Sequence, residues 1–396
     1  MKAVGIIAEY NPMHNGHIYH LKKSKEISGA DFVVCAISGN FTQRGEPAFL
    51  DKYTRAKLAI KQGADLVVEI PFLSSCTSAE YFALGGIGIL EGLGMVDFLS
   101  FGSEEGNLDR LLEIANILKQ EPLWYKEALK KSLDAGESFP SARSKALNRY
   151  EEVLKGSNNI LAIEYLKALK TLKPITFKRE GQAYRDLRTP ANDKAGAAFL
   201  RNMIGNFESW ENKQNLSAEL SKFCPVDTVE EIMKEDHNFF WEENYFKLLL
   251  GAISLKERDI RNIFSVGEGF ENKILKEFRK CKSLKELIDR TSGKRYPKTR
   301  TMRTFTHILT DYRKDMKGKP YTRILGLNEK GRKVLKENIK KSNVTIPLVS
   351  GPTDGKEKGF ESEMELEVRS QDIYNLIMNK DLYAESDYVK KPYIRN

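Results

Sequence analysis

Four short apolar runs alternate with amphipathic stretches over the first hundred residues, and this alternation restricts the possible folds more than any other feature of the chain. The runs span residues 3–8, 31–37, 66–70 and 98–101. Almost uninterrupted hydrophobic runs of this length predict strands that are covered on both faces. Since amphipathic stretches of helical period separate them, we expect an α/β fold in which crossover helices connect a parallel sheet.

Polar or small residues follow the ends of these runs. Residues 38–40 (Ser-Gly-Asn) follow the second run, and Gly102 follows the fourth. A further short run, residues 175–177, is also predicted to be a strand and is followed by Arg179 after one lysine. In open parallel sheets, ligands bind beyond the carboxyl ends of the strands. We therefore expect the functional site at this edge of the sheet.

His14-Asn15-Gly16-His17 follows the first apolar run and opens a predicted helix over residues 18–27. At such a turn the free N–H groups and the positive dipole end of the helix favour phosphate, and each imidazole can add a donor. Gly16, which lacks a Cβ, allows close approach of a nucleotide. The turn therefore predicts a polyphosphate site. Two alternatives stay open: rings that only cap the helix, and zinc ligation by His17 and His20, for which no nearby carboxylate or thiol completes the ligand set.

The length and the charge distribution predict several domains and a polyanionic partner. With 396 residues the chain exceeds one ordinary core. Helical patterning over residues 197–293 separates an α/β region, residues 1–196, from a basic region, residues 294–396. The net charge is +9, and residues 294–341 hold 16 Lys/Arg against 4 Asp/Glu, an excess of about 12. A solvated helical surface is the alternative explanation of this basic stretch.

The remaining composition predicts a cytoplasmic protein without a membrane-spanning segment. No apolar stretch approaches the length of a transmembrane helix, and the first apolar run is too short for a secretory signal. The four cysteines, which are far apart and form no Cys-x-x-Cys pair, are expected to be buried reduced thiols: Cys35, Cys76, Cys224 and Cys281.

Two further features have alternative readings. Residues 85–88 (Gly-Gly-Ile-Gly) lack the third glycine of a dinucleotide-binding loop and follow a helical pattern, so we expect a tight helix contact there. Arg44, Lys52 and Arg55 are candidate phosphate or tRNA contacts, although basic residues on an exposed helix are usually only solvated.

The chain resembles a known family in four segments of its first half. These are GIIAEYNPMHNGH at residues 5–17, SGNFTQRGEPA at 38–48, GADLVVEIP at 63–71 and NNILAIEY at 158–165. Together they are similar to the tRNA(Met) cytidine acetate ligase family, within the nucleotidyltransferase superfamily that is named for His-x-Gly-His. The resemblance implies a Rossmann-like nucleotidyltransferase domain over residues 1–196, followed by a mainly helical region and the basic C-terminal region.

The resemblance also implies a reaction. Acetate and ATP would give acetyl-adenylate and pyrophosphate, and the N4 amine of the wobble cytidine in elongator tRNA(Met) would attack the acetyl carbonyl to form N4-acetylcytidine. Mg²⁺ is expected with ATP, although no acidic cluster in the sequence predicts a metal site. Two other functions stay open: an adenylyltransferase that acts on a small phosphorylated metabolite, and a nucleotide-dependent RNA-binding protein without turnover.

The resemblance assigns His14 and His17 to catalysis as donors to the α- and β-phosphoryl oxygens. An arginine can hold a phosphate with two parallel hydrogen bonds. Gly102 would admit the adenine or ribose, and Asn158 would orient the nucleotide through its amide. Without the family, Arg179 could belong to a surface ion pair, Gly102 could be a turn residue and Asn158 could be a helix N-cap. The implied ATP site comprises Ile7, Ala8, Glu9, Tyr10, Asn11, Pro12, Met13, His14, Asn15, Gly16, His17, Ile18, Tyr19 and His20, with Gly102, Asn158 and Arg179.

The predicted tRNA contacts lie at the start of the basic region. Their side chains can neutralise phosphates of the RNA backbone. These residues are Lys294, Arg295, Lys298, Arg300 and Arg303.

Overall fold

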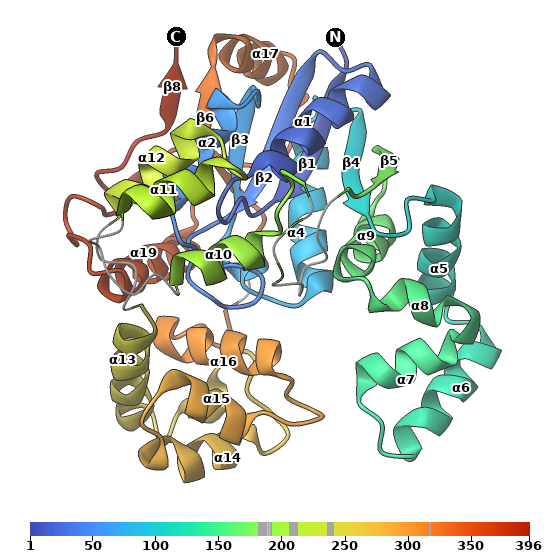
Figure 1. Ribbon diagram of the computed structural model, residues 1–396, viewed down its shortest axis with the longest axis vertical. Helices are drawn as coiled ribbons and strands as arrows, with labels where there is room; N and C mark the ends of the chain where they lie inside the picture. Colours follow the sequence, from blue (N-terminus) through green and yellow to red (C-terminus); the bar gives the residue numbers. More distant parts are fainter. Residues whose placement is uncertain (181–187, 189, 191, 206–212, 236–240, 317) are drawn as a thin grey trace.

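The molecule is built around one mixed sheet (Figure 1). The computed structural model describes residues 1–180, 188, 190, 192–205, 213–235, 241–316 and 318–396. Along the sheet the strand order is β5-β4-β1-β2-β3-β6-β7, and β8 also pairs with β6. The strands are β1 (Ala3–Ala8), β2 (Phe32–Ser38), β3 (Leu66–Ile70), β4 (Phe98–Ser103), β5 (Lys173–Lys178), β6 (Thr322–Asn328), β7 (Leu348–Val349) and β8 (Tyr393–Arg395).

The first five strands confirm the predicted parallel sheet. β1 pairs with β2 and β4, β2 with β3, and β4 with β5, all in parallel. Their carboxyl ends therefore share one edge. β6 differs from the expectation: it comes from the last hundred residues and lies antiparallel to β3. The basic C-terminal region thus contributes strands to the same sheet as the N-terminal region.

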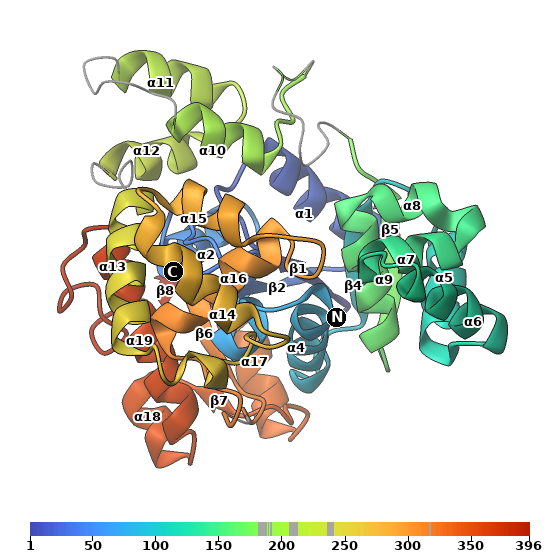
Figure 2. The same ribbon diagram turned by 90° about the horizontal axis from the view of Figure 1, so that it is seen from below.

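Helices cover both faces of this sheet. One face packs against α4, α5, α9 and α17, and the other against α1, α2 and α10–α12. Figure 2 shows α10–α12 on the side of the molecule opposite α17 and α18. The helix bounds are α1 (Asn15–Ser28), α2 (Lys52–Lys61), α3 (Phe72–Ser75), α4 (Ala79–Gly92), α5 (Leu108–Gln120), α6 (Leu123–Asp134), α7 (Phe139–Ala146), α8 (Glu151–Lys155), α9 (Ser157–Ala168), α10 (Ala197–Gly205), α11 (Lys213–Ser221), α12 (Val226–Lys234), α13 (Trp241–Leu255), α14 (Phe270–Glu277), α15 (Leu284–Thr291), α16 (Lys298–Thr310), α17 (Glu329–Lys340), α18 (Pro352–Glu357) and α19 (Glu361–Ile377).

A separate helical core lies below the carboxyl ends of the strands (Figure 1). It is formed by α13–α16 and α19 and by two aromatic side chains, Phe41 and Phe72, which follow β2 and β3. The boundaries predicted at residues 196 and 293 do not coincide with the divisions between the hydrophobic cores. Helices α10–α12 pack on the sheet, whereas α13–α15 pack with α16 and α19.

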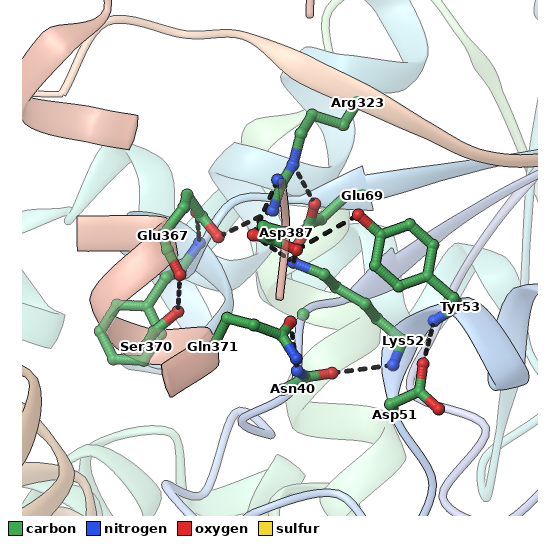
Figure 3. Close-up of polar contacts among 12 residues, drawn as sticks. Asn40, Asp51, Lys52, Tyr53, Glu69, Arg323, Glu367, Ser370, Gln371 and Asp387 are labelled. Carbon is green, nitrogen blue, oxygen red and sulfur yellow. Dashed lines mark hydrogen bonds and ion pairs between the residues drawn. The ribbon is translucent and has the colours of Figure 1, made fainter. Parts of the chain in front are cut away.

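A buried ionic cluster fixes the C-terminal segment to the sheet (Figure 3). Arg323 of β6 pairs with Glu69 of β3 at 2.6 Å, with Asp387 at 2.8 Å and with Glu367 of α19 at 3.3 Å. Lys52 pairs with Glu69 at 3.1 Å and with Asp387 at 2.8 Å. All five side chains are at most 3% exposed. The cluster joins segments that are up to 335 residues apart in the sequence.

The predictions for residues 85–88 and for the cysteines are confirmed. The glycines at 85–88 lie in α4, where a Cβ on Gly86 would meet the Ile7 side chain at 2.7 Å and one on Gly85 would meet Ser74 at 2.4 Å. All four cysteines are free and buried. In the described part of the chain, no helix combines the length and apolar character needed to cross a membrane.

Candidate functional site

A cavity of 170 Å³ opens where the carboxyl ends of β1 and β4 meet the first turns of α1 and α9. Of the residues that the sequence analysis assigns to ATP, many line it. They are Ile7, Ala8, Glu9, Tyr10, Asn11, His14, His17, His20, Gly102, Asn158 and Arg179. The structure therefore brings the His-x-Gly-His turn together with three residues that are distant in sequence.

His14 is the N-cap of α1. Its Nδ1 accepts the backbone N–H of Gly16 at 3.1 Å, and Nδ1 of His17 accepts the backbone N–H of His14 at 3.3 Å. The rings stack with centroids 3.7 Å apart. An Nδ1 that accepts a hydrogen bond carries no proton, so the proton of each neutral ring must lie on Nε2. Capping and ligand binding, which the sequence presents as alternatives, are thus compatible: the cap orients each ring and leaves one N–H donor.

Both of these histidines are neutral at physiological pH. Burial, and then the charges of Arg179 and Arg201, lower the pKa of His14 to about 3. Burial, and then His14 and Arg179, lower the pKa of His17 well below its usual value. The positive charge of the site therefore comes from the arginines, and the imidazoles supply neutral donors.

Arg179 and Asn158 form one hydrogen-bonded unit at the far wall. Nη1 of Arg179 donates to Oδ1 of Asn158 at 3.1 Å, and Nδ2 of Asn158 donates to Oε1 of Glu104 at 2.7 Å. Glu104 also accepts the backbone N–H groups of Asn158 and Asn159 and so caps α9. Asn158 thus lies in the first turn of α9 rather than at its N-cap, which is Gly156. Its amide fixes the direction of the Arg179 guanidinium.

Gly102 provides space for this unit. A Cβ at that position would lie 2.8 Å from Cγ of Arg179. In the structure the glycine therefore makes room for the arginine. The expectation from the family resemblance is that adenine or ribose occupies this space.

Several residues of the cavity are not predicted from the sequence. Arg201 of α10 lines it and donates to the backbone oxygen of Asn11 at 2.8 Å. Arg44, by contrast, is a candidate phosphate or tRNA contact from the sequence, and it does line the cavity. Arg201 had no such signal, because it belongs to an ordinary amphipathic helix. The other missed residues are Gln43, Phe82, Phe101, Ser157, Leu161, Tyr165, Gly196 and Ala197.

His20 follows His17 by three residues in α1. Its ring meets Phe177 edge to face, with centroids 5.2 Å apart, and burial lowers its pKa to about 4. Its buried Nε2 has no hydrogen-bond partner among the described residues. No group of three or more potential metal ligands occurs in the described ranges.

Other predicted ATP residues do not line this cavity. Gly16 and Tyr19 face an adjoining pocket of 30 Å³ that also borders Arg179 and Lys194. Four residues of the segment 7–20 line neither space: Pro12, Met13, Asn15 and Ile18. Met13 is fully buried in the core that includes α1, so its part in the site is to support the turn.

Two basic candidates turn out to be structural. Arg55 is fully buried and donates to the backbone oxygens of Leu50, Ser38 and Gly39. Lys52 belongs to the buried ionic cluster. Neither side chain is accessible to a phosphate or to RNA, because both are nearly excluded from solvent.

The predicted tRNA contacts are divided among different environments. Lys294, Arg295, Arg300 and Arg303 line a cleft of 810 Å³ between the start of α16 and the α6–α7 turn. Arg303 is half-buried and donates to the Gln43 backbone oxygen at 3.4 Å. Burial lowers the pKa of Arg303 to about 10. Its position behind the wall of the first cavity indicates a supporting contact.

Lys298 points to a different space from the other four. It pairs with Asp289 at 2.5 Å and lines a second cavity beside α15, not the basic cleft. The basic segment therefore faces two openings.

The chain is similar to known proteins over nearly its whole length. A family model described as HIGH Nucleotidyl Transferase matches residues 1–388. A Clostridium tetani protein named tRNA(Met) cytidine acetate ligase is 40% identical over 419 residues, which cover 100% of both chains. A protein of the same name from Thermoanaerobacter sp. is 39% identical and covers 98% of both.

Two solved structures are also similar over the whole chain. The apo crystal structure of Thermotoga maritima TmcAL has a TM-score of 0.89 at 30% identity and covers 100% of both chains. The structure of that protein bound with alpha-thio ATP has a TM-score of 0.87 at 29% identity, again over 100% of both chains.

Proposed function

This chain belongs to the tRNA(Met) cytidine acetate ligase family of HIGH nucleotidyl transferases, and from that membership we propose that it uses ATP to acetylate a tRNA cytidine. The observation that carries the proposal is the pair of Nε2–H donors that His14 and His17 hold in one cavity with Arg179 and Arg201. Small neutral donors beside fixed cations suit a polyphosphate that changes charge during reaction.

In the first step, an acetate oxygen attacks the α-phosphorus of ATP. The new P–O bond forms acetyl-adenylate, and the bond to the β-phosphate oxygen breaks to release pyrophosphate. His14 and His17 donate to the α- and β-phosphoryl oxygens, where negative charge accumulates in the transition state. Because the two rings are held by backbone hydrogen bonds, they need no reorganisation as the charge develops.

The arginines neutralise the phosphates. Arg179 is oriented by Asn158 and Glu104, and its planar guanidinium suits two oxygens of one phosphate. Arg201, on α10, lines the same cavity. Binding of ATP offsets the repulsion between these cations and the neighbouring imidazoles.

The cavity also fits a Mg²⁺ ion that arrives with ATP. Among the described residues that line it, Glu9 is the one carboxylate. Mg²⁺ keeps several waters and is usually held by substrate phosphates with one or two carboxylates. Glu9 would be that carboxylate, and the ion would supply neutralisation of the phosphate charge.

In the second step, the cytidine N4 amine attacks the acetyl carbonyl carbon. The C–N bond forms, the bond from this carbon to the AMP oxygen breaks, and N4 loses one proton. We propose the wobble cytidine of elongator tRNA(Met) as the acceptor and N4-acetylcytidine as the product. Residues 1–196 would carry acetate activation, and the cleft lined by Lys294 and Arg295 would hold the RNA.

The test is direct. Purified protein is incubated with elongator tRNA(Met), ATP and ¹³C-acetate, and the tRNA nucleosides are analysed by mass spectrometry. Labelled N4-acetylcytidine that depends on both ATP and acetate is the expected result. Acetylation from acetyl-coenzyme A alone, AMP transfer to a small metabolite, or RNA binding without any product would overturn the proposal.

A further inference from the structure

A second cavity, of 280 Å³, lies beside the nucleotide cavity and shares Arg44 with it. Its walls come from the turn after β2 and from α13, α15 and α16. Trp241, Ile288 and Met302 give it apolar surface, and Glu46 and Glu242 give it carboxylates. None of these residues belongs to the site assigned above.

The partition between the cavities is a rigid turn. The backbone N–H of Thr42 donates to the backbone oxygen of Glu46 at 2.9 Å. The backbone N–H of Gly45 donates to the backbone oxygen of Thr42, also at 2.9 Å. Gly45 has φ +88°, and a Cβ there would lie 2.6 Å from the backbone of Arg303 in α16. The turn is therefore locked against α16, and Arg44 at its tip borders both spaces.

Charged contacts also connect the two spaces. Glu46 of the second cavity lies 3.8 Å from Nη2 of Arg201, which lines the first. Burial, and then the nearby Glu46 carboxylate, raise the pKa of the Glu242 carboxyl. Two acidic side chains, Glu46 and Glu242, thus converge on the second cavity, whereas the third carboxylate of its lining, Asp289, is paired with Lys298. Converging carboxylates favour a ligand that brings N–H donors.

The apolar side of the cavity offers a stacking surface. Trp241 is only partly buried, meets Tyr245 in a T-shaped contact with ring centroids 6.2 Å apart, and presents part of its indole to the cavity. Proteins that read a base in an RNA loop stack it on an aromatic ring and hydrogen-bond its Watson–Crick edge. Lys285 and Lys298 line the same cavity and can meet flanking phosphates.

We propose that this second cavity holds the cytosine that is acetylated, with the base stacked on Trp241 and its N4 amine hydrogen-bonded to the carboxylates of Glu46 and Glu242. This inference rests on the proposed function. The exocyclic amine of cytosine is the donor that Glu reads in nucleic acids, whereas uracil has an acceptor at the same position. Because Arg44 borders both cavities, a base in the second cavity would lie beside the nucleotide cavity in which the acetyl group is activated.

The stacking contact is tested by a double-mutant cycle on binding. An anticodon stem-loop with cytidine at the wobble position is compared with one that is abasic there, using the wild-type protein and Trp241→Ala. Loss of the base should weaken binding to the wild-type protein by about tenfold or more, and should cost Trp241→Ala much less. Trp124→Ala, on exposed α6, is the matched control. Equal losses in all three proteins would overturn the assignment.

The hydrogen-bonding contact is tested by base discrimination. In the wild-type protein, a stem-loop with uridine at the wobble position should bind at least about tenfold more weakly than one with cytidine. Glu242→Gln should reduce this ratio severalfold, because an amide can donate to the uracil oxygen. The control is Glu243→Gln, since Glu243 is exposed on the same helix and pairs with Lys247. An unchanged ratio in Glu242→Gln would contradict the role of that carboxylate.

One further measurement separates this inference from the proposed function. Acetate-dependent ATP–pyrophosphate exchange requires no tRNA, so Trp241→Ala should retain it while its rate of tRNA acetylation falls by about tenfold or more. If the wild-type protein forms no N4-acetylcytidine, the proposed function is wrong. If it does, and Trp241→Ala acetylates tRNA at the same rate, the cytosine lies elsewhere.

Discussion

The imidazole of His17 accepts the backbone N–H of His14 through Nδ1, at 3.3 Å, while the ring of His14 stacks on it. Each histidine of the His-x-Gly-His turn therefore has one ring nitrogen occupied by the helix N-terminus. The spacing of the motif follows from this reciprocal cap, because the side chain that returns to the cap belongs to the third residue after it. These two hydrogen bonds also fix the orientation of each ring and so the direction of its Nε2 atom.

Substitution of His14 can separate its capping role from its role in binding phosphate. Asparagine is a good N-cap residue and can accept the Gly16 N–H, but it has no donor at the position of Nε2. His14→Asn should therefore retain most of the thermal stability and lose acetate-dependent ATP–pyrophosphate exchange by about 10²-fold. His17→Ala should lose a similar factor. Near-wild-type exchange in both variants would show that the donors play no part in activation.

The buried histidines predict a pH dependence of stability. The pKa of His14 is lowered to about 3 by burial and by the nearby arginines, and the pKa of His20 to about 4, while an unfolded histidine titrates near 6.5. Between these values the unfolded chain binds more protons than the folded chain. Stability should therefore fall as the pH drops from about 6.5 to about 3, by up to about 1.4 kcal/mol per pH unit for each such histidine.

The measurement is urea denaturation between pH 4 and 7.5 for the wild-type protein and His20→Gln. The slope of unfolding free energy against pH should be smaller in the variant. Equal slopes would mean that this histidine titrates normally in the folded protein. Ring-proton NMR titration of the folded protein then gives the pKa values directly.

The hydrophobic pattern of the sequence predicts the five parallel strands, because each of them contains a short apolar run. The strands from β1 to β5 are short apolar runs, and their carboxyl ends gather Gly102, Arg179 and the histidine turn as expected. β6 was not predicted, because its few apolar residues are embedded in the basic stretch. Arg323 belongs to this strand, and its charge is neutralised by partners that are distant in sequence, such as Glu69.

Some residues of the site also could not be predicted from local sequence pattern. Arg201 and Trp241 reach their cavities through the packing of α10 and α13, and no motif surrounds either residue. Lys52 and Arg55 look in sequence like the exposed basic face of a helix, whereas the structure buries both. Their burial depends on carboxylates and carbonyl groups that the tertiary fold supplies, so composition and period could not predict it.

The ionic cluster of Figure 3 predicts unequal effects of two carboxylates. Although burial opposes it, the charges of Arg323 and Lys52 hold the pKa of Asp387 at about 2. Asp387→Asn leaves these buried cations underneutralised and should cost about 3–5 kcal/mol of unfolding free energy at pH 7.5. Burial, and then the Glu69 carboxylate, raise the pKa of Glu367 to about 7. Glu367→Gln should therefore be milder.

The sign of the pH effect distinguishes the two positions. Between pH 4.5 and 7 the folded state keeps the Glu367 proton that the unfolded state has lost, so this group lowers stability as the pH rises. The unfolding free energy of Glu367→Gln, measured by urea denaturation over this pH range, should lack that contribution. Glu365→Gln, exposed on the same helix, is the control. A larger loss from Glu367→Gln than from Asp387→Asn at pH 7.5 would contradict this distribution of charge.

The basic cleft between α16 and the α6–α7 turn should carry much of the affinity for tRNA. Lys294, Arg295 and Arg300 line it without belonging to the nucleotide cavity, whereas Arg303 supports the Gln43 backbone and Lys298 pairs with Asp289. Only the first three should therefore be reversed to glutamate. Each phosphate contact contributes about 0.7–0.9 to the slope of log affinity against log salt. The triple variant should bind tRNA more weakly, with a slope reduced by about two to three.

A matched control comes from the same basic stretch of sequence. Arg332, Lys333 and Lys336 are exposed on α17, which lies at the opposite end of the molecule from α14–α16 (Figure 1). Reversal of these three changes the net charge by the same amount but removes no side chain from the cleft. If both triple variants lose affinity and salt dependence equally, the effect is one of overall charge. If only the cleft variant does so, and it keeps acetate-dependent ATP–pyrophosphate exchange, the cleft holds the RNA.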